Sequence, residues 1–204
     1  MRLLDTLGAL AIPGSLPSGI VLFVDRFSGN DSLAARGRMV PAFQTLGAAK
    51  NAAQSGDTII VFPATYTEWD LAKNGVNWHF LIGAKVDPGG SATTSLFAST
   101  SGVYSVTGYG DFTISGSSKF VLSGTFSNVT FKCLKMTANS GAGCIDVPAS
   151  SGILSVECDI AQSTTGVCVG IVSGTNNVAI QDIRVHTRTL CNLTKFLSAR
   201  AIPS

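Results

Sequence analysis

The sequence predicts an all-β fold: a parallel β-helix with a period of about 24–25 residues and an amphipathic helix that caps its N-terminal end. Two observations predict it. Apolar residues recur in parallel columns one period apart, and clusters of turn-forming residues separate short strands of high β-propensity. No helical periodicity follows residue 56. With 204 residues, the chain is long enough for one domain with a substantial core.

The apolar columns are the stronger observation, because three of them share one slightly drifting period. The first is Leu71, Leu96, Phe120, Cys144, Cys168 and Cys191. The second is Trp78, Tyr104, Val129, Ile153 and Val178, and the third is Phe80, Val106, Phe131, Val156 and Ile180. In a parallel β-helix, residues one coil apart lie above one another at about 4.8 Å. We therefore expect each column to form a continuous file inside the coils.

The turn residues and the cysteines fit the same architecture. Small and polar clusters such as Ser123-Gly124 and Gly174-Thr175-Asn176-Asn177 lie between the columns and favour turns. Five cysteines is an odd number, and without CxxC spacing it favours neither a disulfide framework nor zinc. We expect Cys144, Cys168 and Cys191 to act as small apolar core residues in a reduced compartment.

Residues 21–70 differ in character and are predicted to form a strand, a loop, a helical cap and the first coil. The stretch "PAFQTLGAAKNAAQ" at 41–54 predicts an amphipathic helix with proline in its first turn and Gly56 near its C-cap. Phe43, Leu46 and Ala49 mark its apolar face. A β-helix leaves an open end with unpaired backbone, so we expect these three residues to cover it. The coils themselves are expected over 71–204.

Residues 24–68 resemble the entry segment of the right-handed parallel β-helix proteins of the pectin-lyase-like superfamily, including those of phage fibres, spikes and surface proteins. The usual form of that segment is a V-D strand, a G-N-D loop, a P-F-x-T-L-x-x-A helix and then G-D-T-I-x-V-x-P-G-x-Y. "NGVN" at 74–77 also fits, whereas Ala64 stands where the family usually has glycine. The resemblance implies a right-handed coil and a helical cap. It implies no single activity, because the group contains lyases, hydrolases, epimerases, adhesins and spikes.

No arrangement of residues in the sequence predicts an active site. Polysaccharide-cleaving enzymes need paired acids, or a metal-bound carboxylate with a base, projecting from neighbouring coils. Glu157 and Asp159 share a predicted coil and Asp182 lies 23 residues beyond Asp159, so these acids could approach one another on adjacent coils. Without an adjacent acid pair or a dense acidic patch, we expect no catalytic residues, no cofactor and no metal.

Residues 1–20 form an apolar segment rich in glycine and proline. Its large apolar residues are Leu3, Leu4, Leu7, Leu10, Ile12 and Leu16. A free tail of this composition would expose an adhesive surface. We interpret it as an assembly arm that docks on a partner; the equally open alternative is a tail that folds back on its own coils.

A short stack of coils, 13% charged residues and an apolar arm predict a non-enzymatic structural protein. By analogy with β-helices of phage fibres, spikes and decoration proteins, we expect a virion component attached by its arm, homotrimeric or bound to other virion proteins, with surface polysaccharide as a further partner. One alternative is a small carbohydrate-active lyase or hydrolase; another is a secreted protein of the bacterial cell surface. A net charge of +2 does not indicate nucleic-acid binding, and no apolar run is long enough to span a membrane.

Overall fold

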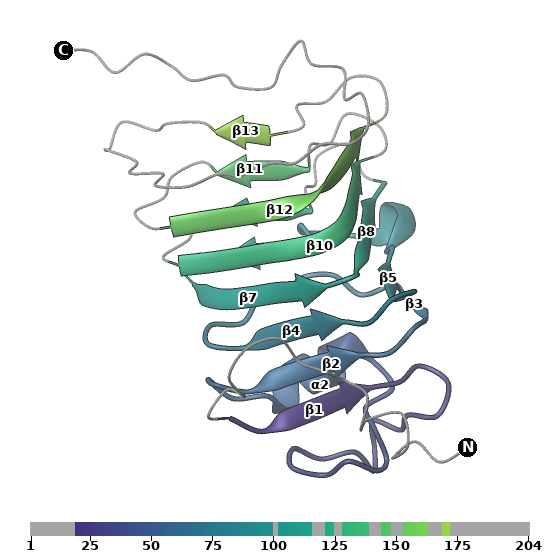
Figure 1. The fold of residues 1–204 in the computed structure, drawn as a ribbon. Coiled ribbons are helices and arrows are strands. Elements are labelled where there is room, and N and C mark those ends of the chain that lie inside the picture. The colour runs from purple at the N-terminus through teal and green to yellow at the C-terminus, as the bar shows by residue number, and fades with distance from the viewer. Residues whose placement is uncertain are drawn as a thin grey trace, which may run out of the picture.

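A computed structural model describes residues 19–99, 102–115, 121–124, 128–138, 144–147, 153–162 and 169–171. This part of the chain is almost entirely β-structure, and every strand pair in it is parallel. Its strands form a nine-stranded sheet and a four-stranded sheet. The all-β prediction is therefore confirmed, and so is the parallel pairing. Figure 1 shows the strands stacked along one direction, with the larger sheet curled.

The nine-stranded sheet contains two rows of strands. The first row stacks β1 (Val21–Val24), β2 (Thr58–Val61), β4 (Asn77–Phe80), β7 (Val103–Gly108), β10 (Asn128–Ala138) and β12 (Ile153–Gln162). The second row stacks β3 (Thr65–Tyr66), β5 (Lys85–Val86) and β8 (Asp111–Ile114) on the C-terminal half of β10. The long strands β10 and β12 belong to both rows, and their pairing shifts between Lys132 and Lys135. This β-bulge lies where the chain passes from one row to the next.

The four-stranded sheet is a third row. It stacks β6 (Phe97–Ser99), β9 (Leu122–Gly124), β11 (Ile145–Val147) and β13 (Val169–Ile171). A single 3-10 turn, η1 (Gly89–Ser91), precedes it in the described chain. Phe97 of the third row, Phe112 of the second and Phe131 of the first pack against one another, with ring centroids 5.1–5.5 Å apart. The inner faces of the three rows therefore share one aromatic core.

Alternation along each strand sets which side chains enter this core. In the first row, the partners Leu22, Ile59, Trp78, Val106, Phe131 and Val156 form one buried file. In the second row, Val86, Phe112 and Met136 form another. The residues that alternate with these buried ones along the strands, such as Lys85 and Asp111, lie on the outer face.

The predicted columns are right about burial and partly wrong about register. Val106, Phe131 and Val156 are partners, as are Tyr104 and Val129. However, Trp78 pairs with Val106 and Phe80 with Gly108, because Trp78 follows Ile59 by 19 residues and Val106 follows Trp78 by 28. A constant period cannot represent these unequal steps. Val129 likewise pairs with Leu154 and not with Ile153.

Over the residues that the structure describes, the first predicted column is correct except at one position. The Leu71 amide donates to the Leu96 carbonyl, and the Leu122 amide donates to the Cys144 carbonyl. Register places Val121 between Leu96 and Cys144, where Phe120 was predicted. Leu71, Leu96, Val121 and Cys144 are fully buried. Phe120, Cys168, Val178, Ile180 and Cys191 lie outside the described residues.

The helix predicted over 41–54 is wrong in extent. Only α2 (Leu46–Ala52) is helical, with Thr45 as N-cap. The residues before it are held elsewhere: Phe43 forms a parallel bridge with Val24, and the Asp31 carboxylate accepts bonds from the amides of Gln44 and Thr45. These contacts fix an extended approach to the helix, so Pro41 does not lie in its first turn. The structure thus does not support a capping helix of the predicted length.

Candidate functional site

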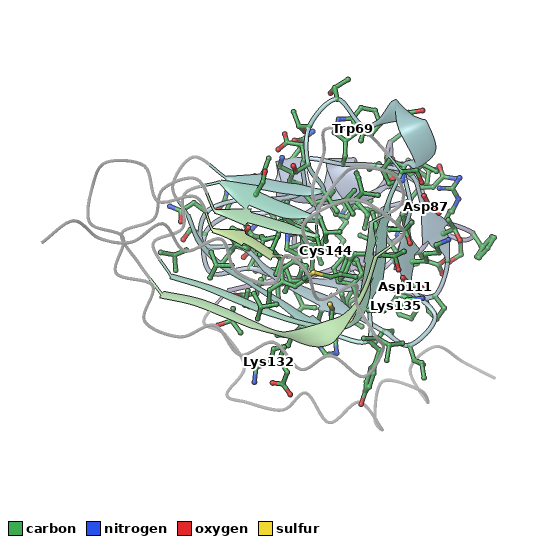
Figure 2. The ribbon with its side chains drawn as sticks, turned by 90° about the horizontal axis from the view of Figure 1, so that it is seen from above. Trp69, Asp87, Asp111, Lys132, Lys135 and Cys144 are labelled. Atoms are coloured by element: carbon green, nitrogen blue, oxygen red, sulfur yellow. The ribbon has the colours of Figure 1, made fainter. Side chains whose placement is uncertain are left out.

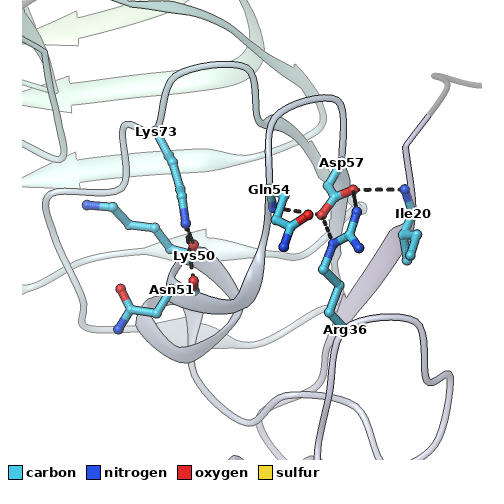
Figure 3. A network of polar contacts seen from close by, with 7 residues as sticks. All are labelled: Ile20, Arg36, Lys50, Asn51, Gln54, Asp57 and Lys73. Atoms are coloured by element: carbon cyan, nitrogen blue, oxygen red, sulfur yellow. Dashed lines mark hydrogen bonds and ion pairs between the residues drawn. The ribbon is translucent and has the colours of Figure 1, made fainter.

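The entry to the first row is fixed by a polar network around Asp57. The Arg36 guanidinium donates from Nε to Oδ2 at 2.6 Å and from Nη2 to Oδ1 at 2.7 Å. The amides of Ile20 and Gln54 donate to the same carboxylate at 2.9 and 2.7 Å. Nearby, Lys73 Nζ donates to the Lys50 carbonyl at the end of α2 (Figure 3). Because the Asp57 carboxylate is enclosed and fully bonded, we interpret this network as structural.

Charged residues gather on the outer face of the second row. Register places Lys85 of β5 beside Asp111 of β8, and Asp111 beside Lys135 of β10. The next register position, on β12, belongs to Asp159. We call Lys85, Asp111 and Lys135 the ionic file. Its charges alternate in sign from one strand to the next. Figure 2 shows Asp111 and Lys135 on the same side of the fold, with Asp87 beside them.

Contacts around the ionic file hold its first lysine in place. Lys85 Nζ lies 2.8 Å from Asp87 Oδ2, and the Gly89 amide donates to Asp87 Oδ1 at 3.1 Å. The hydrogen bond that Lys85 donates to Asp87, together with the charges of Asp87 and Asp111, raises the pKa of Lys85. Asp111 Oδ1 is covered and has no hydrogen-bond donor among the described residues. Lys85 is thus ion-paired with Asp87 beside the file, and one carboxylate oxygen of Asp111 is left unsatisfied.

Large apolar side chains are exposed at the corner between the first and second rows. Ile82, Tyr109 and Leu134 are 72%, 57% and 50% exposed. They come from three successive levels of the stack. Ile82 follows β4, Tyr109 lies between β7 and β8, and Leu134 lies at the bulge of β10, where the chain turns from the first row into the second. We call these three residues the corner ridge. It runs along the stacking direction directly beside the ionic file, because Tyr109 and Leu134 precede Asp111 and Lys135 by two residues and one residue.

The acids considered as a catalytic cluster do not form one in the described chain. Glu157 Oε2 lies 3.2 Å from Lys132 Nζ, on the outer face of the first row. Asp159 lies beyond the bulge at the Lys135 register position, in the second row. Asp182 lies outside the described residues. Among described residues, no three His, Cys, Asp or Glu side chains are grouped so that they could bind a metal ion.

The structure describes the predicted cap residues but not the predicted arm residues. Phe43, Leu46 and Ala49 are all buried, at 5%, 0% and 0% exposure, and α2 packs against β1 and β2. The arm residues Leu3, Leu4, Leu7, Leu10, Ile12 and Leu16 lie outside the described residues. Within the described chain, no helix is both long and apolar enough to cross a membrane.

Sequence reasoning missed the ionic file and the corner ridge. A signal for the file was present: Lys85, Asp111, Lys135 and Asp159 follow one another by 26, 24 and 24 residues, the period of the apolar columns. The ridge has no such signal, because exposed apolar residues in connections cannot be distinguished from buried ones by sequence alone.

Comparison of the chain with protein-family models, with curated proteins and with solved structures finds no match.

Proposed function

We propose that this chain is a right-handed parallel β-helix and that it serves as a non-enzymatic structural protein in the assembly of a virion, as part of a fibre, spike or decoration. The three parallel rows support the solenoid, because their inner faces meet at Phe97, Phe112 and Phe131. The resemblance of residues 24–68 to the pectin-lyase-like entry segment supports the right-handed coil. The virion itself comes from analogy with β-helical phage proteins.

The N-terminal end has two roles in this proposal. Phe43, Leu46 and Ala49 close the first level of the solenoid, which their burial beside β1 and β2 supports. Residues 1–20 form the assembly arm and attach the protein to other virion proteins or to further copies of itself. The Asp57 network supports such an attachment, since it ties Ile20, at the base of the arm, to the first row.

The pairing of surface charges is the observation that carries the non-enzymatic assignment. On the outer faces, Asp87 faces Lys85 and Glu157 faces Lys132. General acid–base hydrolysis needs two carboxyl groups facing one substrate, one of them with a raised pKa. A carboxylate held against a lysine of the same chain suits a structural surface contact better than a role facing substrate. Binding of surface polysaccharide is compatible with such a face and stays part of the proposal.

The mass of the native particle tests this function. We expect the full chain to form a complex larger than one chain, and deletion of residues 1–20 to reduce its mass or abolish its attachment to partner proteins. A single chain whose mass and partner binding do not change on deletion would contradict the assembly role. Release of reducing ends, or of unsaturated products absorbing in the ultraviolet, from a polysaccharide panel would favour the enzyme alternative instead.

A further inference from the structure

We propose that the corner ridge and the ionic file together form the surface through which two copies of this chain pair, side by side and antiparallel, about a two-fold axis. This inference rests on the proposed assembly role and assigns it a specific surface. It concerns pairing only; attachment through residues 1–20 is a separate contact.

The ridge supplies the apolar centre of such a contact. Ile82, Tyr109 and Leu134 are at least half exposed, and the backbone is hydrogen-bonded at two of these positions. The Tyr109 amide donates to the Phe80 carbonyl at 2.8 Å, and the Leu134 amide donates to the Gly110 carbonyl at 3.1 Å. A contiguous, rigid apolar strip on a protein surface marks an interaction site more often than isolated exposed residues do. Because the strip follows the stacking direction, it fits a partner that is elongated in the same direction.

The ionic file selects a second copy as that partner. Neighbouring strands are about 4.8 Å apart, so the charges of Lys85, Asp111 and Lys135 alternate at that spacing. A two-fold axis midway between the levels of Asp111 and Lys135 brings each Asp111 opposite the Lys135 of the other copy.

The same two-fold axis also brings apolar side chains of the two copies together. Tyr109 lies at the level of Asp111 and Leu134 at the level of Lys135. The axis therefore brings Tyr109 opposite Leu134 of the other copy, so that an aromatic ring meets an aliphatic side chain twice. Parallel packing in register would instead bring like charges together, which is unfavourable.

Other occupants fit this surface less well. The ionic file and Asp87, which pairs with Lys85, together carry two positive and two negative charges, so a uniformly charged polysaccharide or lipid surface gains no net attraction from them. Only a partner with its own alternating charges at the strand spacing matches every position. A second copy of this chain has that pattern because its sequence and strand spacing are identical.

The test compares the full chain with surface variants by native mass spectrometry and by dissociation on dilution. We expect particles with an even number of chains. The double substitution Tyr109→Ser and Leu134→Ser should raise the dissociation constant of the pair by about tenfold or more, as removal of central apolar contacts does. Val103→Ser is the matched control, because Val103 is 47% exposed but is the first residue of β7, at the strand end opposite the ridge. It should leave the constant unchanged.

Charge exchange between copies provides a second, independent measurement. Lys135→Glu alone brings two acids together at the axis, and Asp111→Lys alone brings two lysines together, so each variant should pair poorly with itself. Mixed, the two variants restore both opposite-charge contacts and should form mixed pairs. Circular dichroism confirms that each variant folds; if Asp111→Lys does not, the Tyr109 and Leu134 substitutions still decide.

The outcomes separate this inference from the assembly role. A particle that depends on residues 1–20 but not on the ridge, including a three-chain particle, would overturn the pairing and leave the assembly role standing. Equal effects of Val103→Ser and the ridge substitutions would also overturn it. A single chain under all conditions would contradict both.

Discussion

Arg36 and Asp57 form a bidentate ion pair that joins the loop after β1 to the residue immediately before β2. The Asp57 side chain is fully buried and also accepts amide bonds from Ile20 and Gln54. One carboxylate thus connects the loop, the start of the first row and the chain that follows α2. Such a bidentate, charge-assisted pair has a geometry that lysine could not reproduce.

Replacing Asp57 by asparagine should remove an acid-sensitive part of the stability. The hydrogen bonds from Arg36 lower the pKa of Asp57 to about 2. A lowered folded pKa stabilises the protein above the unfolded value near 4, and that stability is lost as the pH falls toward about 2. With allowance for solvent screening, we expect the ionised Asp57 to contribute about 1–2 kcal/mol to the free energy of unfolding at neutral pH. Denaturant melts between pH 2 and 5 should show a steeper pH dependence for the wild type than for Asp57→Asn.

Asp70→Asn is the control for that comparison. Asp70 is half exposed and pairs with Lys50 at the protein surface, so its loss should cost less than about 1 kcal/mol at neutral pH. Equal destabilisation by the two substitutions would contradict the connecting role of Asp57.

Tyr66 should limit stability at alkaline pH. Its hydroxyl donates to the Phe62 carbonyl at 3.0 Å, and burial raises its pKa to about 12. A raised folded pKa stabilises the protein below the unfolded value near 10, and the contribution is lost as the pH rises toward 12. Tyr66→Phe should cost about 1 kcal/mol at pH 7 and flatten the unfolding curve between pH 10 and 12. A variant with the wild-type alkaline slope would exclude Tyr66 as its source.

Gly108 should tolerate no side chain. Its φ is +101°, and a Cβ there would overlap the carbonyl oxygen of Phe80 on the neighbouring strand. Gly108→Ala should therefore destabilise the protein by about 1–3 kcal/mol, measured by thermal or denaturant unfolding. At Gly90 a Cβ meets nothing within 4 Å, so Gly90→Ala should be nearly neutral. Similar values for the two variants would show that β4 and β7 are not in the stated register.

Lys132 and Glu157 test the pairing of β10 with β12. Their charged atoms are 3.2 Å apart, and both side chains are about half exposed. A double-mutant cycle with alanine at both positions should give a coupling free energy of about 0.2–1 kcal/mol that salt reduces. Zero coupling at low salt, with both single variants folded, would place the two residues apart.

The sequence was sufficient for the parallel pairing and for most of the core. Trp78, Tyr104, Val106 and Phe131 are all buried as the columns required. Their predicted partners on neighbouring strands are only partly correct, because the number of residues from one level to the next is not constant. Burial is predicted correctly because it depends only on the alternation of side chains along a strand. An error of two residues between Tyr104 and Val106 keeps the side chain on the inner face, so the burial prediction survives where the register prediction fails.

The helix and the surface were harder to predict for a different reason. The pattern at 41–54 is amphipathic, but tertiary contacts of Phe43 with Val24 and of Gln44 with Asp31 override the helical preference before Leu46. The ionic file could have been found by applying the same period to charged residues. The corner ridge could not, because its exposure is set by how the connections between rows turn.

The central claim is that the three rows enclose one core, and the rings of Phe97, Phe112 and Phe131 test it most directly. Nuclear Overhauser effects between these rings, measured with selectively labelled phenylalanine and assigned through Phe→Leu variants, should link all three, since their centroids are 5.1–5.5 Å apart. If the Phe97 ring instead shows contacts to neither Phe112 nor Phe131 in the folded protein, the third row does not close over the other two and the proposed solenoid is wrong.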